Sequence, residues 1–371
     1  MGQRKKDEYV HESINKNAEK AFKRYCQKAG VKTGAVLARY GFSALPSYGS
    51  TQVVRTKGIE YTSETIETLG SKIYIADEMH RVFGMGHEWY RNIGWDAVAT
   101  IVNDSITRGT QPYLISMQLS VDSGRWFEDT HRSQNIVDGW VEACMFSGCF
   151  YGQGETSTII QFEPGIPSCF LGGSATGFAK NADSLITGNI EVDDQIILFP
   201  SAGLQTNGYT TARRIALAAP NKFETRMSDG RMYGEALLDR SIIYTEVIMN
   251  AVMRGVKIHH AVHITGNAWL KFMDTPEPFV HNFDVIPEPS TVFKFIQEHG
   301  KFSDRRMYAT FNMGAGFAVY VPSSDVNLMM QIGRDMGAFV GGYVKRPENG
   351  KGLVSINPKK LDFVPSVKNY L

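Results

Sequence analysis

Two apolar stretches of this chain each end in small residues and an acid. Residues 93–104 read I-G-W-D-A-V-A-T-I-V-N-D, and residues 148–156 read G-C-F-Y-G-Q-G-E-T. Such a run predicts a buried strand or helix that carries its acid into a cleft, because an unpaired buried charge is strongly unfavourable. Two acids on separate elements, Asp104 and Glu155, suit a divalent cation and the phosphates that it carries. A helix cap or a salt bridge is the alternative for each acid, and for Asp96 we favour the cap.

Length and charge limit the class of protein further. A chain of 371 residues exceeds the size of one hydrophobic core, so two domains are expected. Its 39 Lys and Arg balance 38 Asp and Glu, which argues against a nucleic-acid or membrane partner. No apolar run approaches the roughly 20 residues that span a bilayer. The four cysteines form no CxxC pair, which favours a cytoplasmic protein without a zinc site.

The hydrophobic pattern mixes helices and strands in both halves of the chain. In the first half it predicts helices over residues 7–30 and 136–146 and strands over residues 72–76, 95–102 and 113–121. In the second half it predicts strands over residues 196–199 and 307–321 and helices over residues 210–219, 240–254 and 326–336. A polar stretch over residues 181–194 lies between them. We therefore expect an α+β protein with domains at 1–185 and 186–371.

Six segments, in order along the chain, match motifs of one known family. Residues 93–104 look like G-I-D-L-V-A-M-x-V-N-D, 107–112 like v-x-G-A-e-P, 148–156 like G-C-x-L-v-G-G-E-T, 201–209 like S-S-G-x-H-S-N-G-Y, 263–266 like the start of H-I-T-G-G-G, and 311–316 like F-N-x-G-x-G. The chain thus resembles the phosphoribosylformylglycinamidine cyclo-ligases, also called aminoimidazole ribonucleotide synthetases, as a divergent member.

This resemblance implies a two-domain PurM-like fold and an ATP-dependent enzyme of purine biosynthesis. In the family the N-terminal sheets of two subunits form a dimer barrel, and the C-terminal domain is an α/β sandwich. The implied reaction closes formylglycinamidine ribonucleotide to aminoimidazole ribonucleotide, with ATP and Mg²⁺. Two alternatives stay open: a non-catalytic paralogue that acts as a binding or structural subunit, and a related ATP-dependent amide-activating enzyme. We expect a homodimer through the strands at 72–76, 95–102 and 113–121.

The resemblance also implies roles for individual residues. The expected nucleotide-binding residues are Asp77, Arg81, Asn103, Asp104, Gly154, Glu155 and Thr156, of which Asp77, Asp104 and Glu155 would hold the metal. The expected catalytic residues are Gln205 and His263, and the expected substrate-binding residues are Asn207, Gly208, Tyr209, Thr265 and Gly266. For His263 a buried structural role is the alternative.

Several motif positions differ from the family pattern. We place the nucleotide motif D-G-V-G-T-K at Asp77, where the sequence reads D-E-M-H-R and only the acid and a basic residue survive. A loop without glycine cannot approach phosphate closely. Gln205 replaces the histidine of H-S-N-G-Y. Its amide can form hydrogen bonds but cannot act as an acid or base near neutral pH. Asn267 and Ala268 replace the last glycines of H-I-T-G-G-G.

Overall fold

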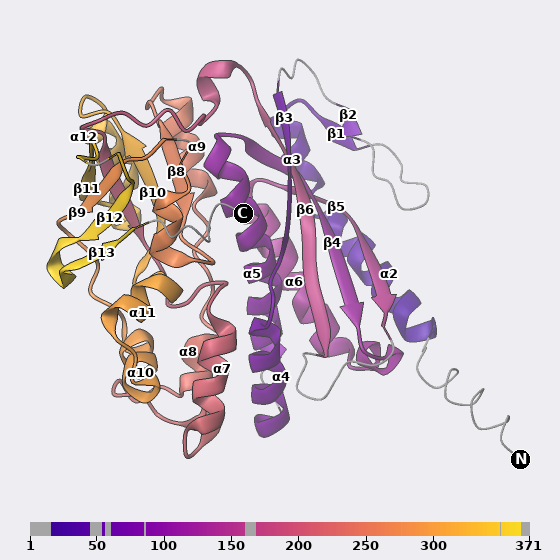
Figure 1. The fold of residues 1–371 in the computed structure, drawn as a ribbon. Coiled ribbons are helices and arrows are strands. Elements are labelled where there is room, and N and C mark those ends of the chain that lie inside the picture. The colour runs from indigo at the N-terminus through magenta and orange to yellow at the C-terminus, as the bar shows by residue number, and fades with distance from the viewer. Residues whose placement is uncertain are drawn as a thin grey trace, which may run out of the picture. The chain divides into compact units, whose positions relative to one another are not determined.

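The computed structural model of this protein describes residues 16–44, 54–55, 61–84, 87–159, 168–275, 277–348 and 350–364. The chain divides into two compact units (Figure 1). Unit 1 consists of Met1–Ser105 and Gln111–Lys180, and unit 2 of Ile106–Thr110 and Asn181–Leu371. Each unit builds helices around its own sheet, so the predicted two-domain α+β fold is confirmed. None of the helices in the described ranges is long and apolar enough to cross a membrane.

The main sheet of unit 1 has four strands in the order β3-β6-β4-β5. Their bounds are Tyr61–Thr68 for β3, Cys169–Ala179 for β6, Gln111–Val121 for β4 and Phe150–Thr158 for β5. Strand β6 is antiparallel to β3 and β4, whereas β5 is parallel to β4. A separate antiparallel pair joins β1 (Ser43–Ala44) to β2 (Val54–Arg55).

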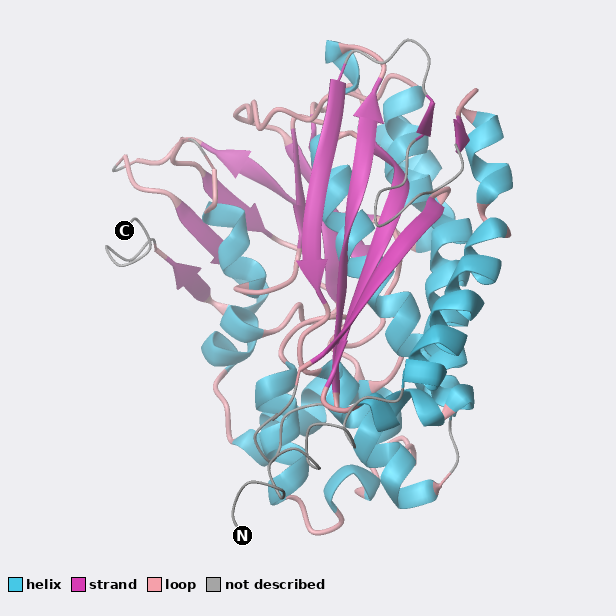
Figure 2. Cartoon of the chain, turned by 90° about the vertical axis from the view of Figure 1, so that its right-hand side faces the viewer, coloured by secondary structure: helices cyan, strands magenta, loops and turns pink. Residues whose placement is uncertain are grey.

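Helices cover one face of the four-stranded sheet. Helices α5 (His87–Ser105) and α6 (Thr130–Ser147) pack on this face, α4 (Lys72–Phe83) packs against α5, and α2 (Lys16–Val31) packs beside β5 and α6. Figure 2 shows the sheet from its other side, with helices behind and beside it. We call that other side, where Ile66, Gln118 and Phe170 are exposed, the open face.

Two glycines let α5 and α6 approach each other backbone to backbone. A Cβ on Gly94 would collide with the carbonyl oxygen of Ile136, and a Cβ on Gly139 would collide with that of Arg91. The glycine of the I-G-W-D segment is therefore a packing residue. This helix pair forms the layer on which the sheet of unit 1 rests.

Gly139→Ala should destabilise unit 1 although alanine is the better helix former. The added methyl group meets backbone, which cannot rotate away, so the two helices must separate. We expect a loss near the upper end of the usual overpacking cost of about 1–3 kcal/mol. Urea denaturation measures it, and Gly34→Ala, where no atom lies within 4 Å of the added Cβ, is the control. Equal stabilities of the two variants would contradict the close approach.

Unit 2 is built on a seven-stranded sheet in the order β13-β12-β9-β11-β7-β10-β8. The strands are β7 (Gln195–Pro200), β8 (His260–His263), β9 (Val280–Phe283), β10 (Ala315–Val321), β11 (Phe339–Lys345), β12 (Leu353–Ile356) and β13 (Leu361–Phe363). All neighbours are antiparallel except β12 and β9. Every residue of β10, the strand between β7 and β8, is buried.

In unit 2 the helices lie between the strands along the chain. They are α7 (Tyr209–Ala218), α8 (Tyr233–Leu237), α9 (Thr245–Met253), α10 (Thr291–Gly300), α11 (Asp304–Thr310) and α12 (Val326–Gly333). Apolar side chains of α9, such as Ile248, join Phe199 and Val319 of the sheet in one core. The methionines Met249 and Met329 also belong to this core.

Two predicted strands of unit 1 are wrong. Residues 72–76 begin helix α4, in which Lys72, Ile73, Ala76 and Met79 are buried at helical spacing. The predicted window of five residues was too short to separate a period of 3.6 from a period of 2. Residues 95–102 lie inside α5, whose apolar residues are buried on every side, so the expected alternation with polar residues is absent.

Other sequence predictions are mostly confirmed. Strands at 113–121 and 196–199 and helices at 136–146 and 210–219 lie within β4, β7, α6 and α7 apart from end residues. The predicted helix at 7–30 is α2 from Lys16 onward, and its earlier part lies outside the described residues. The helices predicted at 240–254 and 326–336 are shorter, as α9 and α12. The predicted strand at 307–321 is half wrong, because α11 ends at Thr310 and β10 starts at Ala315.

Candidate functional site

Three of the motif segments meet at one edge of the sheet in unit 2. Strand β10 pairs with both β7 and β8 and is antiparallel to each. The ends of β7 and β8 therefore lie beside the start of β10. Residues 201–209 follow β7, residues 264–268 follow β8, and residues 311–314 precede β10. We call these segments the strand-end loops.

The side chain of Asn312 ties two of these loops together. Its Nδ2 donates to the carbonyl oxygen of Gly203 at 2.9 Å, and its Oδ1 accepts from Ser201 Oγ at 2.8 Å and from the N–H of Gly314 at 3.0 Å. The backbone oxygen of Asn312 also accepts from the indole of Trp269 at 3.0 Å. Asn312, which the sequence marks as part of F-N-x-G-x-G, is thus a positioning residue for the strand-end loops.

The side-chain amide of Gln205 is buried and hydrogen-bonded within the protein. The residue is 2% exposed. Its side-chain oxygen Oε1 accepts a hydrogen bond from the N–H of Ile242 at 2.9 Å, and its Nε2 donates one to Tyr244 Oη at 3.3 Å. Its backbone is left-handed, with φ of +59°. His263 is also buried, at 2% exposure, at the end of β8. For both residues the structure supports a structural role, which was the alternative for His263; their predicted catalytic roles stay predictions.

The predicted substrate-binding residues lie together on the strand-end loops. Gly208 caps helix α7 with φ of +87°, and the side chain of Asn207 lies against Gly266. Tyr209 is buried, and its hydroxyl donates to backbone oxygens of Gln205 and Leu237, so it anchors the loop. Gly266 is exposed, and Thr265 lies beside it at 9% exposure. Of the predicted substrate-binding residues, Asn207 and the backbone around Gly208 and Gly266 therefore remain accessible to a ligand.

The open face of unit 1 carries a second candidate site, a cavity of about 480 Å³. It crosses the middle of the sheet, and its lining includes Glu67 of β3 and Glu155 of β5. Gly172 and Gly173 of β6 lie between these two strands in the sheet. Of the predicted nucleotide-binding residues, Gly154 and Glu155 line this cavity and are exposed, whereas Thr156 is buried.

The remaining predicted nucleotide residues lie on helices. Asn103 is 1% exposed and Asp104 is partly buried, and both belong to the last turn of α5. Asp77 and Arg81 belong to α4. Arg81 is an exposed side chain that pairs with Glu78 at 2.7 Å. The cavity on the open face is lined by none of these four residues.

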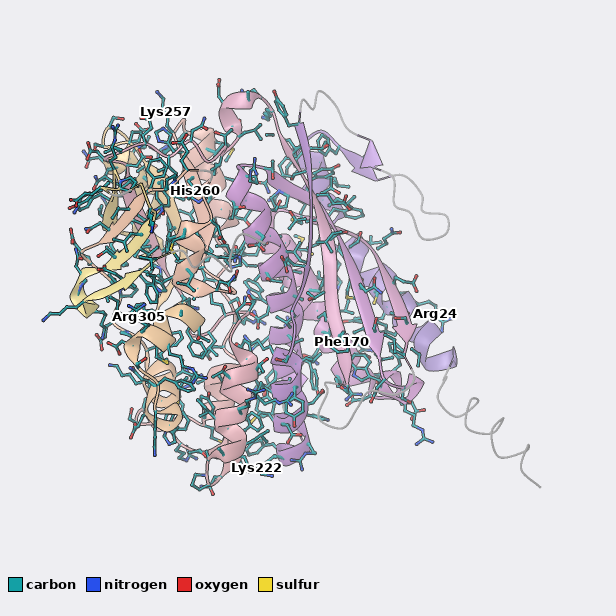
Figure 3. The ribbon with its side chains drawn as sticks, in the orientation of Figure 1. Arg24, Phe170, Lys222, Lys257, His260 and Arg305 are labelled. Carbon is teal, nitrogen blue, oxygen red and sulfur yellow. The ribbon has the colours of Figure 1, made fainter. Side chains whose placement is uncertain are left out.

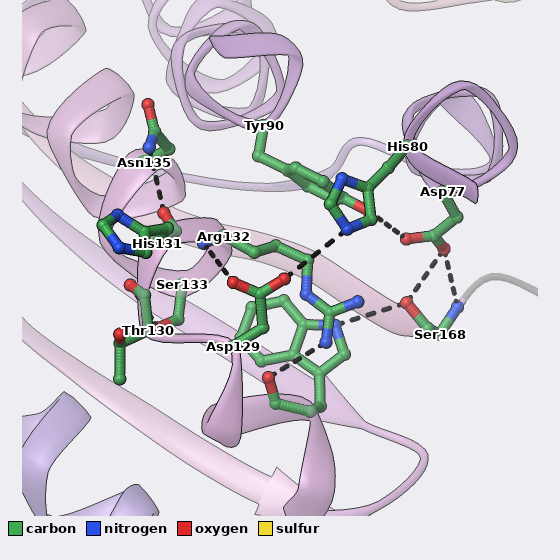
Figure 4. Close-up of polar contacts among 11 residues, drawn as sticks. Asp77, His80, Tyr90, Asp129, Thr130, His131, Arg132, Ser133, Asn135 and Ser168 are labelled. Atoms are coloured by element: carbon green, nitrogen blue, oxygen red, sulfur yellow. Dashed lines mark hydrogen bonds and ion pairs between the residues drawn. The ribbon is translucent and has the colours of Figure 1, made fainter. Parts of the chain in front are cut away.

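Asp77 is a structural clamp in this fold (Figure 4). Its Oδ1 accepts from the hydroxyl of Tyr90 at 2.8 Å, and its Oδ2 accepts from the N–H and the hydroxyl of Ser168 at 3.0 and 2.8 Å. Burial, with the charge of Asp77 nearby, raises the pKa of the Tyr90 hydroxyl, which therefore stays a donor. The guanidinium carbon of Arg132 lies over the ring of Trp126, 4.7 Å from the ring centre. Asp77 thus joins α4, α5 and the start of β6.

The nucleotide motif matches better ten residues earlier. Residues 67–72 read E-T-L-G-S-K, which keeps an acid, the second glycine, a hydroxyl and the lysine at the spacing of D-G-V-G-T-K. Strand β3 ends at Thr68, Gly70 has φ of +68°, and α4 starts at Lys72. This strand–turn–helix geometry is what such a motif requires. The spacing itself could have revealed it, so its placement at Asp77 is corrected.

Lys72 and Asp96 form a fully buried ion pair. The Nζ of Lys72 lies 2.5 Å from Oδ2 of Asp96, and both side chains are 0% exposed. Asp96 lies in the middle of α5, so the predicted helix cap is wrong and the residue forms this ion pair instead. The pair joins the first turn of α4 to α5.

The three predicted metal ligands do not form one centre. Tyr90, which binds Asp77, and Asp104 are separated by fourteen residues of α5, which corresponds to about 21 Å along the helix. Both carboxylate oxygens of Asp77 already accept hydrogen bonds. In the part of the chain that the structure describes, no three His, Cys, Asp or Glu side chains gather in a group that could hold a metal ion. These residues therefore do not fit a resident Mg²⁺.

Comparison with known proteins agrees with the fold and the motif loops. The family described as "AIR synthase related protein, N-terminal domain" matches residues 49–179. A phosphoribosylformylglycinamidine cyclo-ligase of Methanosarcina acetivorans is 31% identical over 292 residues, which cover 78% of this chain and 82% of that protein. The one from Methanosarcina mazei is 30% identical with the same coverage.

Solved structures show the same fold at low identity. The hydrogenase maturation protein HypE superimposes with a TM-score of 0.61 at 14% identity, covering 89% of this chain and 93% of that one. Thiamine-monophosphate kinase from Stenotrophomonas maltophilia gives a TM-score of 0.59 at 15% identity, covering 89% and 96%.

The chain thus has two α+β domains. One has an open sheet face, and the other has glycine-containing loops at its strand ends. The chain belongs to the phosphoribosylformylglycinamidine cyclo-ligase family. The family and the enzyme class predicted from the sequence are thereby confirmed.

Proposed function

We propose that this protein catalyses the ATP-dependent ring closure of formylglycinamidine ribonucleotide to aminoimidazole ribonucleotide. The observation that supports this most directly is the identity of about 30% with cyclo-ligases over most of both chains. ATP transfers its terminal phosphoryl group to the oxygen of the formyl amide, which releases ADP. An amidine nitrogen then attacks the formyl carbon, and the phosphorylated oxygen leaves as phosphate. Such chemistry depends mainly on positioning and on neutralising phosphate charge.

The two candidate sites suggest a division of roles between the predicted domains. We assign nucleotide binding to the domain at 1–185, which carries the E-T-L-G-S-K turn of residues 67–72 between β3 and α4, and substrate binding to the strand-end loops of the domain at 186–371. A solved HypE, which shares this fold at 15% identity, is in complex with ATP. Mg²⁺ would arrive bound to ATP.

Purified full-length protein incubated with formylglycinamidine ribonucleotide and ATP·Mg²⁺ tests the proposal. The expected result is an aminoimidazole product formed in equal amount to ADP. Omission of the ribonucleotide is the control for background ATP hydrolysis. Absence of the product and of ADP above that background would refute the cyclo-ligase function.

The burial of Gln205 favours one further candidate, a non-catalytic paralogue that binds nucleotide or supports another subunit. A side chain whose amide is bound to Ile242 and Tyr244 cannot replace the proton chemistry of a histidine. Calorimetric titration with ATP·Mg²⁺ separates this candidate from the enzyme. Micromolar binding that Asp104→Ala abolishes, together with turnover, would exclude it; binding without turnover of any amide substrate would support it.

We also propose that the protein is a homodimer formed through the open face of the β3-β6-β4-β5 sheet. Two of the strands first expected there are helices, so the proposal now depends on the face that carries exposed Ile66 and Phe170. Light scattering at low micromolar concentration should give twice the 41.3 kDa chain mass. Ile66→Lys should shift the mass toward the monomer, because charges on both copies would be buried in a symmetric interface. Val31→Lys, on an exposed residue of α2, is the control; a monomeric parent protein would contradict the proposal.

A further inference from the structure

Lys271 is a charged residue that contacts the strand-end loops and belongs to none of the sequence motifs. It lies in the short helical segment η5 (Ala268–Met273), directly after residues 264–268. Its neighbours Trp269 and Phe272 are 0% exposed and hold this segment in the core. Lys271 itself is only partly buried, so its ammonium group is held in a fixed place beside the loops while it remains reachable.

The ammonium group of Lys271 has only neutral partners. Its Nζ donates to Thr265 Oγ1 at 2.6 Å and to the backbone oxygen of His263 at 3.2 Å. Within the described residues, no carboxylate pairs with it. An ammonium has three N–H donors, so one donor and the whole positive charge are available for a ligand.

Backbone donors lie next to this charge. The N–H groups of Gly266 and Asn267, both exposed residues, bind no acceptor in the described part of the chain. Asn267 and Ala268 have φ of +64° and +47°, so the turn keeps a left-handed backbone even where alanine replaces the glycine of the motif. Such a conformation is unfavourable for alanine and persists only where the surroundings fix it.

We propose that Lys271, with the N–H groups of Gly266 and Asn267, binds the phosphate ester of a ribonucleotide substrate. A fixed ammonium beside free backbone N–H groups is a donor set for a phosphate oxygen, because charge-assisted hydrogen bonds are about twice as strong as neutral ones. The identity of the ligand as a ribonucleotide rests on the proposed function. The oxyanion chemistry rests on the contacts of Lys271 and on the two backbone N–H groups, and not on the proposed function. Lys271 is then a substrate-binding residue that acts on affinity.

Calorimetric titration of the full-length protein with ribose 5-phosphate, and with ribose as the uncharged probe, tests the site. Lys271→Gln keeps a hydrogen-bond donor for Thr265 and removes the charge. We expect it to weaken ribose 5-phosphate binding at least tenfold, which is about 1.4 kcal/mol. Lys271→Arg should recover most of the affinity, and ribose binding should not change. Lys257→Met, on an exposed lysine of the same unit (labelled in Figure 3), is the matched control.

Steady-state kinetics separate this proposal from the cyclo-ligase function. With formylglycinamidine ribonucleotide, Lys271→Gln should raise KM at least tenfold and change kcat little, whereas a misfolded loop would lower kcat as well. Turnover with an unchanged KM and unchanged ribose 5-phosphate affinity in Lys271→Gln would overturn the site and leave the function standing. Lysine-dependent binding of ribose 5-phosphate without turnover would refute the function and leave the site standing. No binding of ribose 5-phosphate to the parent protein at millimolar concentration would also overturn the site.

Discussion

Lys72→Met should remove about 3–5 kcal/mol from the free energy of unfolding, because it removes the cation that faces the buried carboxylate of Asp96. Both side chains of the pair are 0% exposed, so water cannot solvate the remaining charge. The loss should be seen as a lower urea midpoint in circular dichroism. It should also loosen the contact of α4 with α5, which this ion pair joins at the first turn of α4.

The double variant Lys72→Met/Asp96→Leu identifies the cause of that loss. Replacing both charges by apolar groups of similar size is often neutral, so most of the stability should return. Lys294→Met, which breaks an exposed ion pair with Glu288, should change stability little. A double variant as unstable as Lys72→Met would show that lysine packing, and not the unpaired charge, carries the effect.

The family and the order of its motifs could be predicted from the sequence, because six spaced segments constrain one another. The function of single motif residues could not. In the I-G-W-D segment, Gly94 permits a close helix contact and Asp96 binds Lys72. Both are packing roles that depend on α6 and α4, elements distant in sequence. The motif match therefore located the fold correctly, whereas the contacts that Gly94 and Asp96 make with other helices could not be predicted from it.

The nucleotide motif was misplaced for a reason that lies in the local pattern. Residues 72–76 alternate enough to suggest a strand, and this choice put the strand end, where a phosphate loop belongs, at Asp77. The structure starts α4 at Lys72, so the strand end is at Thr68 and the glycine turn is at Gly70. Short apolar windows do not separate helix from strand without their flanking turn residues.

In unit 2 the sequence indicated the three strand-end loops but not their shared edge. Their meeting depends on β10 pairing with both β7 and β8, which are separated by more than fifty residues. Lys271 belongs to no motif and becomes visible only through its contact with Thr265. Hydrophobic periodicity in a single sequence predicts local elements, but it does not show which strands pair or which distant residues meet.

The stability of unit 2 should fall by about 3 kcal/mol between pH 7 and pH 4 through His281 alone. His281 is 1% exposed, and its Nδ1 lies 2.8 Å from the hydroxyl of Tyr320. Burial, with a smaller effect of His260, lowers the pKa of His281 from 6.5 to about 3. Its other ring nitrogen, Nε2, has no hydrogen-bond partner among the described residues, so nothing compensates a charge there.

The sign follows from proton uptake. In the unfolded chain His281 is protonated below its ordinary pKa of 6.5, whereas in the folded protein it is protonated only below a pKa of about 3. Stability from this residue is therefore complete above pH 6.5 and is lost progressively as the pH falls. His281→Gln, which keeps an acceptor for Tyr320, should shrink the difference in unfolding free energy between pH 7 and pH 4 by the same amount. His299→Gln, on an exposed histidine of α10, is the control. Urea unfolding curves at both pH values measure the difference. Equal pH dependence in the parent protein and in His281→Gln would show that His281 is protonated in the folded protein as readily as in the unfolded chain.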